Sequence, residues 1–98
     1  MVYELVWERD RGFCVLCSLQ GQRIRATEMH HIIPRSRCVG RYRYLREDVR
    51  NVAMLCRLCH HPSPSREEKR LMLCYLRDTY GYTYDEPPFK EALGENDG

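Results

Sequence analysis

The chain has 98 residues and a net charge of +2, with 43% hydrophobic and 31% charged residues, which fits one folded domain and excludes a disordered chain. No apolar run approaches the roughly 18 residues of a membrane span, and the acidic first ten residues lack the apolar segment of an export signal. We therefore expect a cytoplasmic protein with no membrane partner.

Positive charge is concentrated in the middle of the chain. Residues 23–57 contain nine arginines against three acids, a net charge of +6, whereas residues 85–98 carry a net charge of −4. Fourteen of the sixteen basic residues are arginine, whose planar guanidinium matches phosphate oxygens better than lysine does. A solvated charged surface is the ordinary interpretation. Because the positive segment surrounds two adjacent histidines, a phosphate-bearing partner is favoured.

The first half of the chain predicts one helix and a hairpin. Apolar residues at helical spacing predict a helix over residues 2–9. Residues 13–17 are typical of a strand that enters a tight turn. Residues 23–33 alternate loosely and predict a hairpin whose second strand contains the sequence HHII, with Pro34 ending the strand.

Residues 35–50 predict a long basic loop in which arginines alternate with two tyrosines. This loop either lies against a nucleic-acid backbone or packs its tyrosines on the core, and the sequence leaves both alternatives open. The apolar run 51–56 follows it.

A helix start is clear at Ser65, because Ser65 and Glu68 form a capping box, and Gly81 is placed to end that helix. We take residues 1–84 as one domain and residues 85–98 as an acidic, flexible tail.

Two Cys-x-x-Cys pairs of equal spacing predict a metal site. Four thiolates satisfy tetrahedral Zn²⁺ and leave no open position, so the zinc would be structural. Disulfides suit a secreted chain, and a redox pair requires a thioredoxin-like context that is missing here, so metal is favoured. Cys74 fits an apolar helix stripe, and Cys38 has no assigned role. The predicted ligands are Cys14, Cys17, Cys56 and Cys59.

Four stretches together resemble a known family: CVLC (14–17), EMHHIIPRS (28–36), DVRNVAMLC (48–56) and CRLCHH (56–61). They are similar to the zinc-bearing branch of the HNH endonucleases, over about residues 3 to 80. The family's order of His, Asn and His is met by His31, Asn51 and His60. The resemblance implies an α+β fold, a small ββα-metal domain with a structural four-cysteine zinc site, flanked by an N-terminal and a C-terminal helix.

The resemblance also implies roles for individual residues. His30 and His60 correspond to the ligands of a catalytic divalent ion, Mg²⁺ or Mn²⁺. His31 corresponds to the general base, and Asn51 to the residue that pins the connecting loop and orients that base.

One position departs from the family pattern. A further histidine often stands four residues after the last metal ligand, and this chain has Pro64 there. His61 would face elsewhere on a helix, so the ion would have two protein ligands, as suits a loosely held Mg²⁺. Candidate phosphate contacts are Arg35, Arg37 and Arg57.

The resulting prediction is a metal-dependent DNA endonuclease that acts on double-stranded DNA and leaves a 5′ phosphate. By resemblance, proteins of this kind belong to phage packaging or mobile elements, which would place this one in the host cytoplasm, and we expect a monomer. One alternative is a non-catalytic zinc-ribbon module that binds nucleic acid. The other is a protein-interaction adaptor that uses the acidic tail and nearby aromatic residues.

Overall fold

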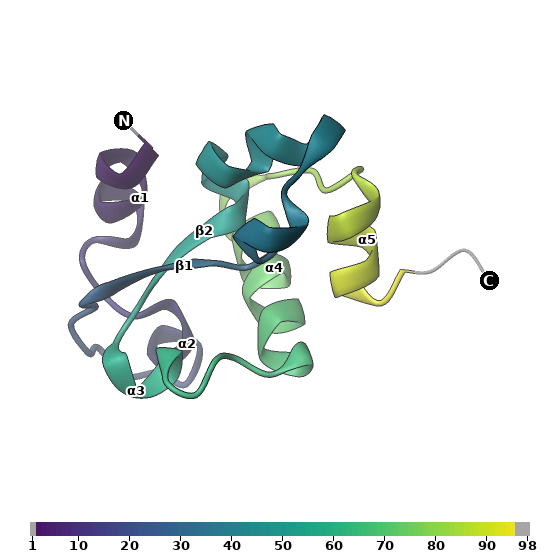
Figure 1. Cartoon of the computed structure of the whole chain (residues 1–98). Coiled ribbons are helices and arrows are strands. Elements are labelled where there is room, and N and C mark those ends of the chain that lie inside the picture. Colours follow the sequence, from purple (N-terminus) through teal and green to yellow (C-terminus); the bar gives the residue numbers. More distant parts are fainter. Residues whose placement is uncertain (1, 96–98) are drawn as a thin grey trace.

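The computed structural model describes residues 2–95, which surround a two-stranded antiparallel sheet (Figure 1). The predicted α+β arrangement is confirmed, with helices before, between and after the two strands. In chain order the elements are α1 (Val2–Asp10), α2 (Val15–Leu19), β1 (Glu28–His31), η1 (Arg35–Arg37), η2 (Gly40–Glu47), η3 (Val49–Asn51), β2 (Val52–Leu55), α3 (Arg57–His60), α4 (Arg66–Tyr80) and α5 (Pro87–Leu93), where η denotes a 3₁₀ helix.

The strand register places the two adjacent histidines on opposite faces of the sheet. His30 lies opposite Ala53 and His31 lies opposite Val52. The predicted hairpin within residues 23–33 is therefore wrong, because the strand that carries HH pairs with β2 and not with the residues just before it. Successive side chains of a strand alternate between faces, so Glu28 shares a face with His30. The sequence prediction that each histidine has its own environment follows from this alternation.

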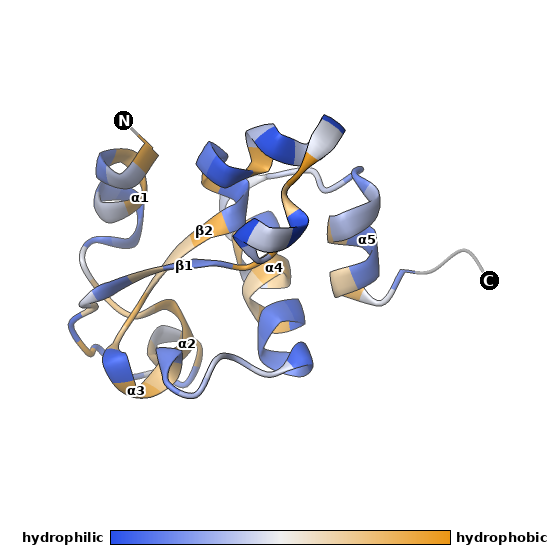
Figure 2. Cartoon of the chain, viewed as in Figure 1, coloured by the Kyte–Doolittle hydropathy of each residue, from blue (hydrophilic) through white to orange (hydrophobic). Residues whose placement is uncertain are grey.

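A separate apolar cluster covers each face of the sheet. On the His30 face, Ala53 and Leu55 join the main core with α2, α4 and α5, whereas on the other face Val52 and Met54 pack with Val6 of α1. Figure 2 shows β2 as an apolar strand, in contrast to the mostly polar β1. The second strand is therefore buried on both faces, between the two apolar clusters.

Two charged residues attach α1 to the sheet. The buried carboxylate of Asp10 accepts a hydrogen bond from the Met54 backbone N–H at 3.0 Å. Arg9 donates to the carbonyls of Val49 and Val52, each at 2.7 Å. The predicted N-terminal helix is thus confirmed and is tied to both ends of β2.

The basic segment before β2 is more ordered than the predicted loop. It forms the three 3₁₀ helices η1, η2 and η3. Of its two tyrosines, Tyr42 packs against the main core, whereas Tyr44 is 52% exposed. Packing on the core is therefore confirmed for Tyr42 and not for Tyr44, and contact with nucleic acid stays a prediction.

The ends of α4 agree with the sequence prediction. The Ser65 hydroxyl accepts from the Glu68 backbone N–H, the Glu68 carboxylate accepts from the Ser65 N–H, and Gly81 adopts the left-handed conformation at the end of the helix. Among the helices of residues 2–95, none is long and apolar enough to cross a membrane.

The prediction of a flexible tail is wrong for residues 87–93. These residues form α5, which packs against α4 with Phe89 fully buried (Figure 1). Glu86, just before the helix, accepts hydrogen bonds from Arg50 at 2.6 and 3.0 Å and from Tyr44 at 2.6 Å. The acidic composition favoured a solvent-exposed tail. The apolar side of α5 packs against α4 instead, and the bonds of Glu86 hold the segment to Arg50 and Tyr44. Residues 96–98 of the predicted tail lie outside the described residues.

Replacing Glu86 by Gln tests this attachment and should make stability less dependent on pH. The pKa of Glu86 is lowered to about 2, mainly because its carboxylate accepts hydrogen bonds from the Arg50 guanidinium. A lowered pKa stabilises the folded state above the ordinary carboxyl pKa, and this contribution disappears as the pH falls through about 2. Glu86→Gln should therefore lower the free energy of unfolding by about 2 kcal/mol at pH 7, measured by thermal denaturation. The difference in free energy of unfolding between the variant and the wild type should shrink as the pH falls from about 5 toward 2.

The control is Glu8→Gln, which removes the same charge from an exposed position of α1. A deficit that is equal for the two variants, or constant with pH, would contradict the role of the Glu86–Arg50 pair.

Candidate active site and metal centre

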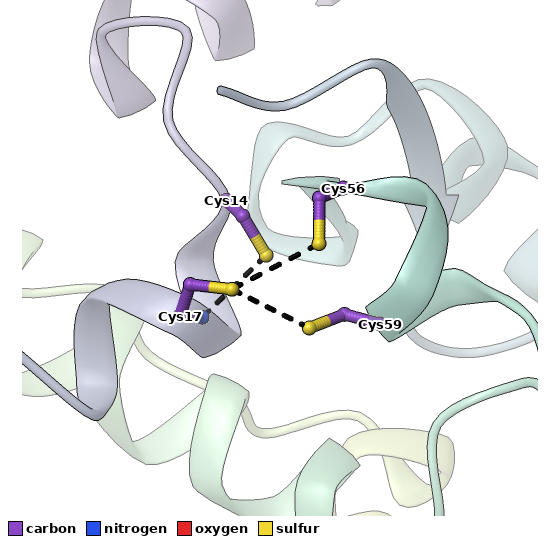
Figure 3. A group of neighbouring side chains, drawn as sticks. All are labelled: Cys14, Cys17, Cys56 and Cys59. Carbon is purple, nitrogen blue, oxygen red and sulfur yellow. Dashed lines mark hydrogen bonds between the residues drawn. The ribbon is translucent and has the colours of Figure 1, made fainter. Parts of the chain in front are cut away.

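Four cysteine side chains converge where α2 meets α3 (Figure 3). The Cys17 sulfur lies 3.8 Å from that of Cys56 and 3.6 Å from that of Cys59, and all four sulfurs lie within 4.8 Å of one another. Sulfurs bound tetrahedrally about 2.3 Å from one ion would be about 3.8 Å apart. The four thiols therefore have the spacing of a structural zinc site.

Each cysteine pair begins a short helix. The Cys14 sulfur, just before α2, accepts a hydrogen bond from the Cys17 backbone N–H at 3.5 Å. Cys56 stands just before α3, and its backbone carbonyl accepts from the Cys59 N–H at 3.2 Å. The predicted strand over residues 13–17 is wrong, because only Phe13 forms an isolated bridge, with Arg25, before the chain turns into α2. The turn is what directs both thiols of a pair toward the same point.

The environment of the thiols favours a bound cation. The pKa of Cys17 is raised to about 11, mainly by burial and to a smaller extent by the neighbouring thiols. The same causes raise the pKa of Cys59. Several thiolates in one buried cluster repel one another, so they ionise together only when a cation neutralises them. The cluster is thus compatible with structural zinc.

His30 presents a buried nitrogen with no partner among the described residues. Its side chain is 7% exposed, and its Nε2 atom makes no hydrogen bond. Burial, and then the charges of His60 and Lys69, lower the pKa of His30 to about 4, which keeps the ring neutral at pH 7. A neutral imidazole with a free lone pair is suited to bind a metal ion.

His60 lies beside His30 and is held by Glu28. The two imidazole centroids are 5.1 Å apart, and the Nδ1 atom of His60 is 3.1 Å from the Glu28 carboxylate. In metal sites, ligating histidines commonly donate their second ring N–H to a carboxylate, which fixes the ring and leaves the other nitrogen for the ion. The structure therefore brings together the two predicted ligands of the catalytic ion.

Glu28 is a site residue that the sequence prediction missed. The same carboxylate oxygen also lies 2.9 Å from Nε2 of His61, so the expectation that His61 faces elsewhere is wrong. The helix α3 ends at His60, and His61 turns back toward β1 instead of continuing the helix. The Glu28, His60 and His61 ligand atoms form a second group able to hold a metal ion. The two histidines hold the pKa of Glu28 below its usual range.

His31 is oriented by the loop that Asn51 clamps. The buried Asn51 amide accepts from the Ile33 N–H at 2.7 Å and donates to the Ile33 and Leu45 carbonyls at 3.2 and 3.1 Å. The next carbonyl, that of Arg46, lies 2.8 Å from Nε2 of His31. Because a carbonyl oxygen can only accept, Nε2 carries the hydrogen of this contact, and Nδ1 is not engaged in it.

The HNH endonuclease family model matches residues 14–63, just over half of the chain. The match spans both cysteine pairs and all four predicted active-site residues. The chain belongs to the HNH endonuclease family. No curated protein and no solved structure gives a significant match. The resemblance seen in the sequence is thus confirmed at the level of the family.

The three arginines predicted to contact phosphate differ in their surroundings within the HNH domain. Arg57 is exposed at the start of α3. Arg35 lines a cleft of about 470 Å³ beside Arg43 and Arg46. Arg37 instead forms an ion pair with Glu91 of α5 at 2.8 Å. Two of the three are therefore open to a ligand, and the third is already paired with a carboxylate.

The two remaining cysteines are packing residues. Cys38 is fully buried beneath Asn51, and burial raises the pKa of its thiol. Cys74 packs against the main core from α4, as predicted. Neither belongs to the four-thiol cluster of the HNH domain.

Replacing Cys56 by Ser should remove both the metal and the fold. The remaining three thiols leave the site incomplete, and structural zinc contributes on the order of 10 kcal/mol to folding in small domains. We expect the variant to contain less than stoichiometric zinc by atomic emission and to lose its cooperative thermal transition by circular dichroism. Cys74→Ser is the matched control and should keep both. A folded Cys56→Ser protein without zinc would contradict the structural role.

Proposed function

We propose that this HNH domain is a metal-dependent DNA endonuclease in which His31 is the general base. The observation that supports this most directly is the hydrogen bond between Nε2 of His31 and the Arg46 carbonyl, because it leaves Nδ1 free to accept a proton. Asn51 is a positioning residue, since it holds the loop that supplies this carbonyl.

The reaction is the hydrolysis of a phosphodiester bond. His31 removes a proton from a water molecule, whose oxygen attacks phosphorus in line with the bond to the 3′ oxygen. That bond breaks with its electron pair going to the 3′ oxygen, which takes up a proton, and the product strand ends in a 5′ phosphate. The imidazole of His31 can accept this proton itself, without a cofactor.

The residues around His30 fit a divalent ion, Mg²⁺ or Mn²⁺. His30 offers an unpartnered buried nitrogen, and His60 is oriented by Glu28. Such an ion, when bound, supplies positive charge where the leaving oxygen becomes negative. Mg²⁺ and Mn²⁺ prefer oxygen ligands, which the scissile phosphate and water would add to the two imidazoles.

The other cofactor and partner assignments complete the proposal. The four cysteines hold structural Zn²⁺, and the substrate is double-stranded DNA, contacted by Arg35, Arg37 and Arg57 without reading its sequence. The protein acts as a monomer in the cytoplasm, and association with phage packaging is carried over from the family resemblance.

His31→Ala should abolish DNA cleavage and leave the fold intact. Removing the base should slow cleavage about 10²- to 10⁴-fold, because that is the range that general acid–base catalysis contributes. Supercoiled plasmid is incubated with wild type or variant in Mg²⁺, Mn²⁺ or EDTA, and nicked and linear products are quantified on gels.

Circular dichroism and zinc content serve as controls for folding. Cleavage by the variant at the wild-type rate would remove His31 from the mechanism. If neither protein cuts with any metal while both bind DNA, the non-catalytic binding module replaces the nuclease.

Glu28→Gln should weaken the catalytic metal site. Losing a carboxylate that orients a metal-binding histidine typically lowers metal affinity about 10- to 100-fold. We expect the Mn²⁺ concentration for half-maximal plasmid cleavage to rise by such a factor, while zinc content stays unchanged. Glu4→Gln on α1 is the charge-matched control. An unchanged Mn²⁺ dependence would exclude Glu28 from the site.

A further inference from the structure

A basic pocket lies where β1 leads into η1, on the side of the sheet that holds α4 and α5. Its volume is about 200 Å³, and its floor is formed by residues 32–34, which directly follow the proposed base. Figure 1 shows α5 alongside α4, and Arg37 of η1 completes the lining of the pocket. The pocket is thus lined by three helices, η1, α4 and α5, and by the segment that leaves β1.

Cations dominate the lining of the pocket. Arg37 contributes from η1, and Arg66 and Lys69 contribute from the first turns of α4, against the single acid Glu91. Neither Arg66 nor Lys69 has an ion-pair partner among residues 2–95. Glu67, beside them on α4, is neutralised by Arg70. The pocket therefore carries net positive charge directed at its interior.

The chain itself links the pocket to the proposed active site. Ile32, Ile33 and Pro34 line the pocket and directly follow His31, the last residue of β1. An anion bound to Arg66 and Lys69 would therefore lie against the stretch of chain that leaves the proposed base.

The pocket already contains a carboxylate. Glu91 of α5 pairs with Arg37 at 2.8 Å, with both side chains about half exposed. An exposed ion pair of this kind is weak and exchangeable, contributing about 0–1 kcal/mol. In this pair α5 supplies the carboxylate that lies against Arg37.

We propose that this pocket is a phosphate subsite of the nuclease, in which Arg66 and Lys69 bind a backbone phosphate that neighbours the one being cut. Glu91 competes with that phosphate for Arg37 and so reduces the affinity for DNA. The assignment rests on the proposed function, because the ligand is a strand whose next phosphate lies at His30 and His31. It gives α5 a role beyond packing.

The test measures DNA binding and its salt dependence separately from catalysis. Every protein carries His31→Ala so that the DNA stays intact, and binding to a fluorescein-labelled duplex is followed by anisotropy at several NaCl concentrations. Arg66→Gln with Lys69→Gln should lower affinity about tenfold or more and reduce the slope of log K against log salt by about two, since each lost phosphate contact reduces it by about one. Glu91→Gln should raise affinity roughly two- to fivefold.

Two controls match the charge changes elsewhere on the protein. Arg23→Gln with Arg25→Gln removes two charges from positions that do not line the pocket, and Glu4→Gln removes one acid from α1. If the Arg23/Arg25 double variant loses as much DNA affinity as the Arg66/Lys69 double variant, binding depends only on overall charge and the subsite is overturned. Equal affinity of Glu91→Gln and its parent would overturn the competition by α5.

Plasmid cleavage by the protein with native His31 separates the two proposals. If the salt slope changes as predicted but the protein with native His31 does not cut the plasmid, the pocket binds phosphate and the nuclease proposal is refuted. Cleavage with an unchanged slope would refute only the subsite.

Discussion

The meeting of four thiols from two distant segments is the constraint on which the rest of the structure depends. One pair precedes the sheet and the other follows it, and their sulfurs approach within bonding range of a single ion. Cys56 stands directly after β2 and begins α3, and His60 ends that helix. An ion at the thiols therefore fixes the direction in which α3 leaves the sheet. That direction brings His60 against His30 and Glu28.

The sheet and the Asn51 clamp divide the chemistry between two neighbouring residues. Alternation along β1 places His30 in the main core, where its nitrogen is sheltered from water, and places His31 at the opposite face. A buried neutral imidazole suits metal binding, whereas a half-buried imidazole with one nitrogen bonded suits proton transfer from water. Asn51 enforces this division because its amide bonds both ends of the segment that reaches His31. The adjacent histidines thus have distinct functions in the proposed mechanism.

Local sequence signals predicted the parts of the fold that depend on neighbouring residues. The capping box at Ser65 and the glycine at position 81 defined α4, and the cysteine spacing predicted the thiol cluster. The helix α2 was missed because its five residues are too few to show a helical period. The helix α5 was missed because an acidic, proline-containing stretch is typical of a loop, although proline at the first turn and Phe89 and Leu93 at a spacing of four were available signals.

Residues whose roles depend on tertiary contacts were beyond local patterns. Glu28 is an ordinary acid in the sequence, and its role appears only when α3 ends and His61 turns back toward β1. The pairing of Arg37 with Glu91 joins residues 54 positions apart. Asn51 was assigned by family resemblance, and the structure supplies the physical reason in its three bonds to the loop backbone. A family pattern thus locates the site, and packing determines which further residues support it.

The most direct test of the account is a Co²⁺ titration of the reduced, metal-free protein, followed by visible absorption and circular dichroism. We predict that the first equivalent produces thiolate-to-cobalt charge-transfer bands and tetrahedral d–d bands, and restores helical structure in parallel, because the four thiols organise the fold. A first equivalent that binds without thiolate bands, or a metal-free protein that is already fully folded, would contradict the central claim.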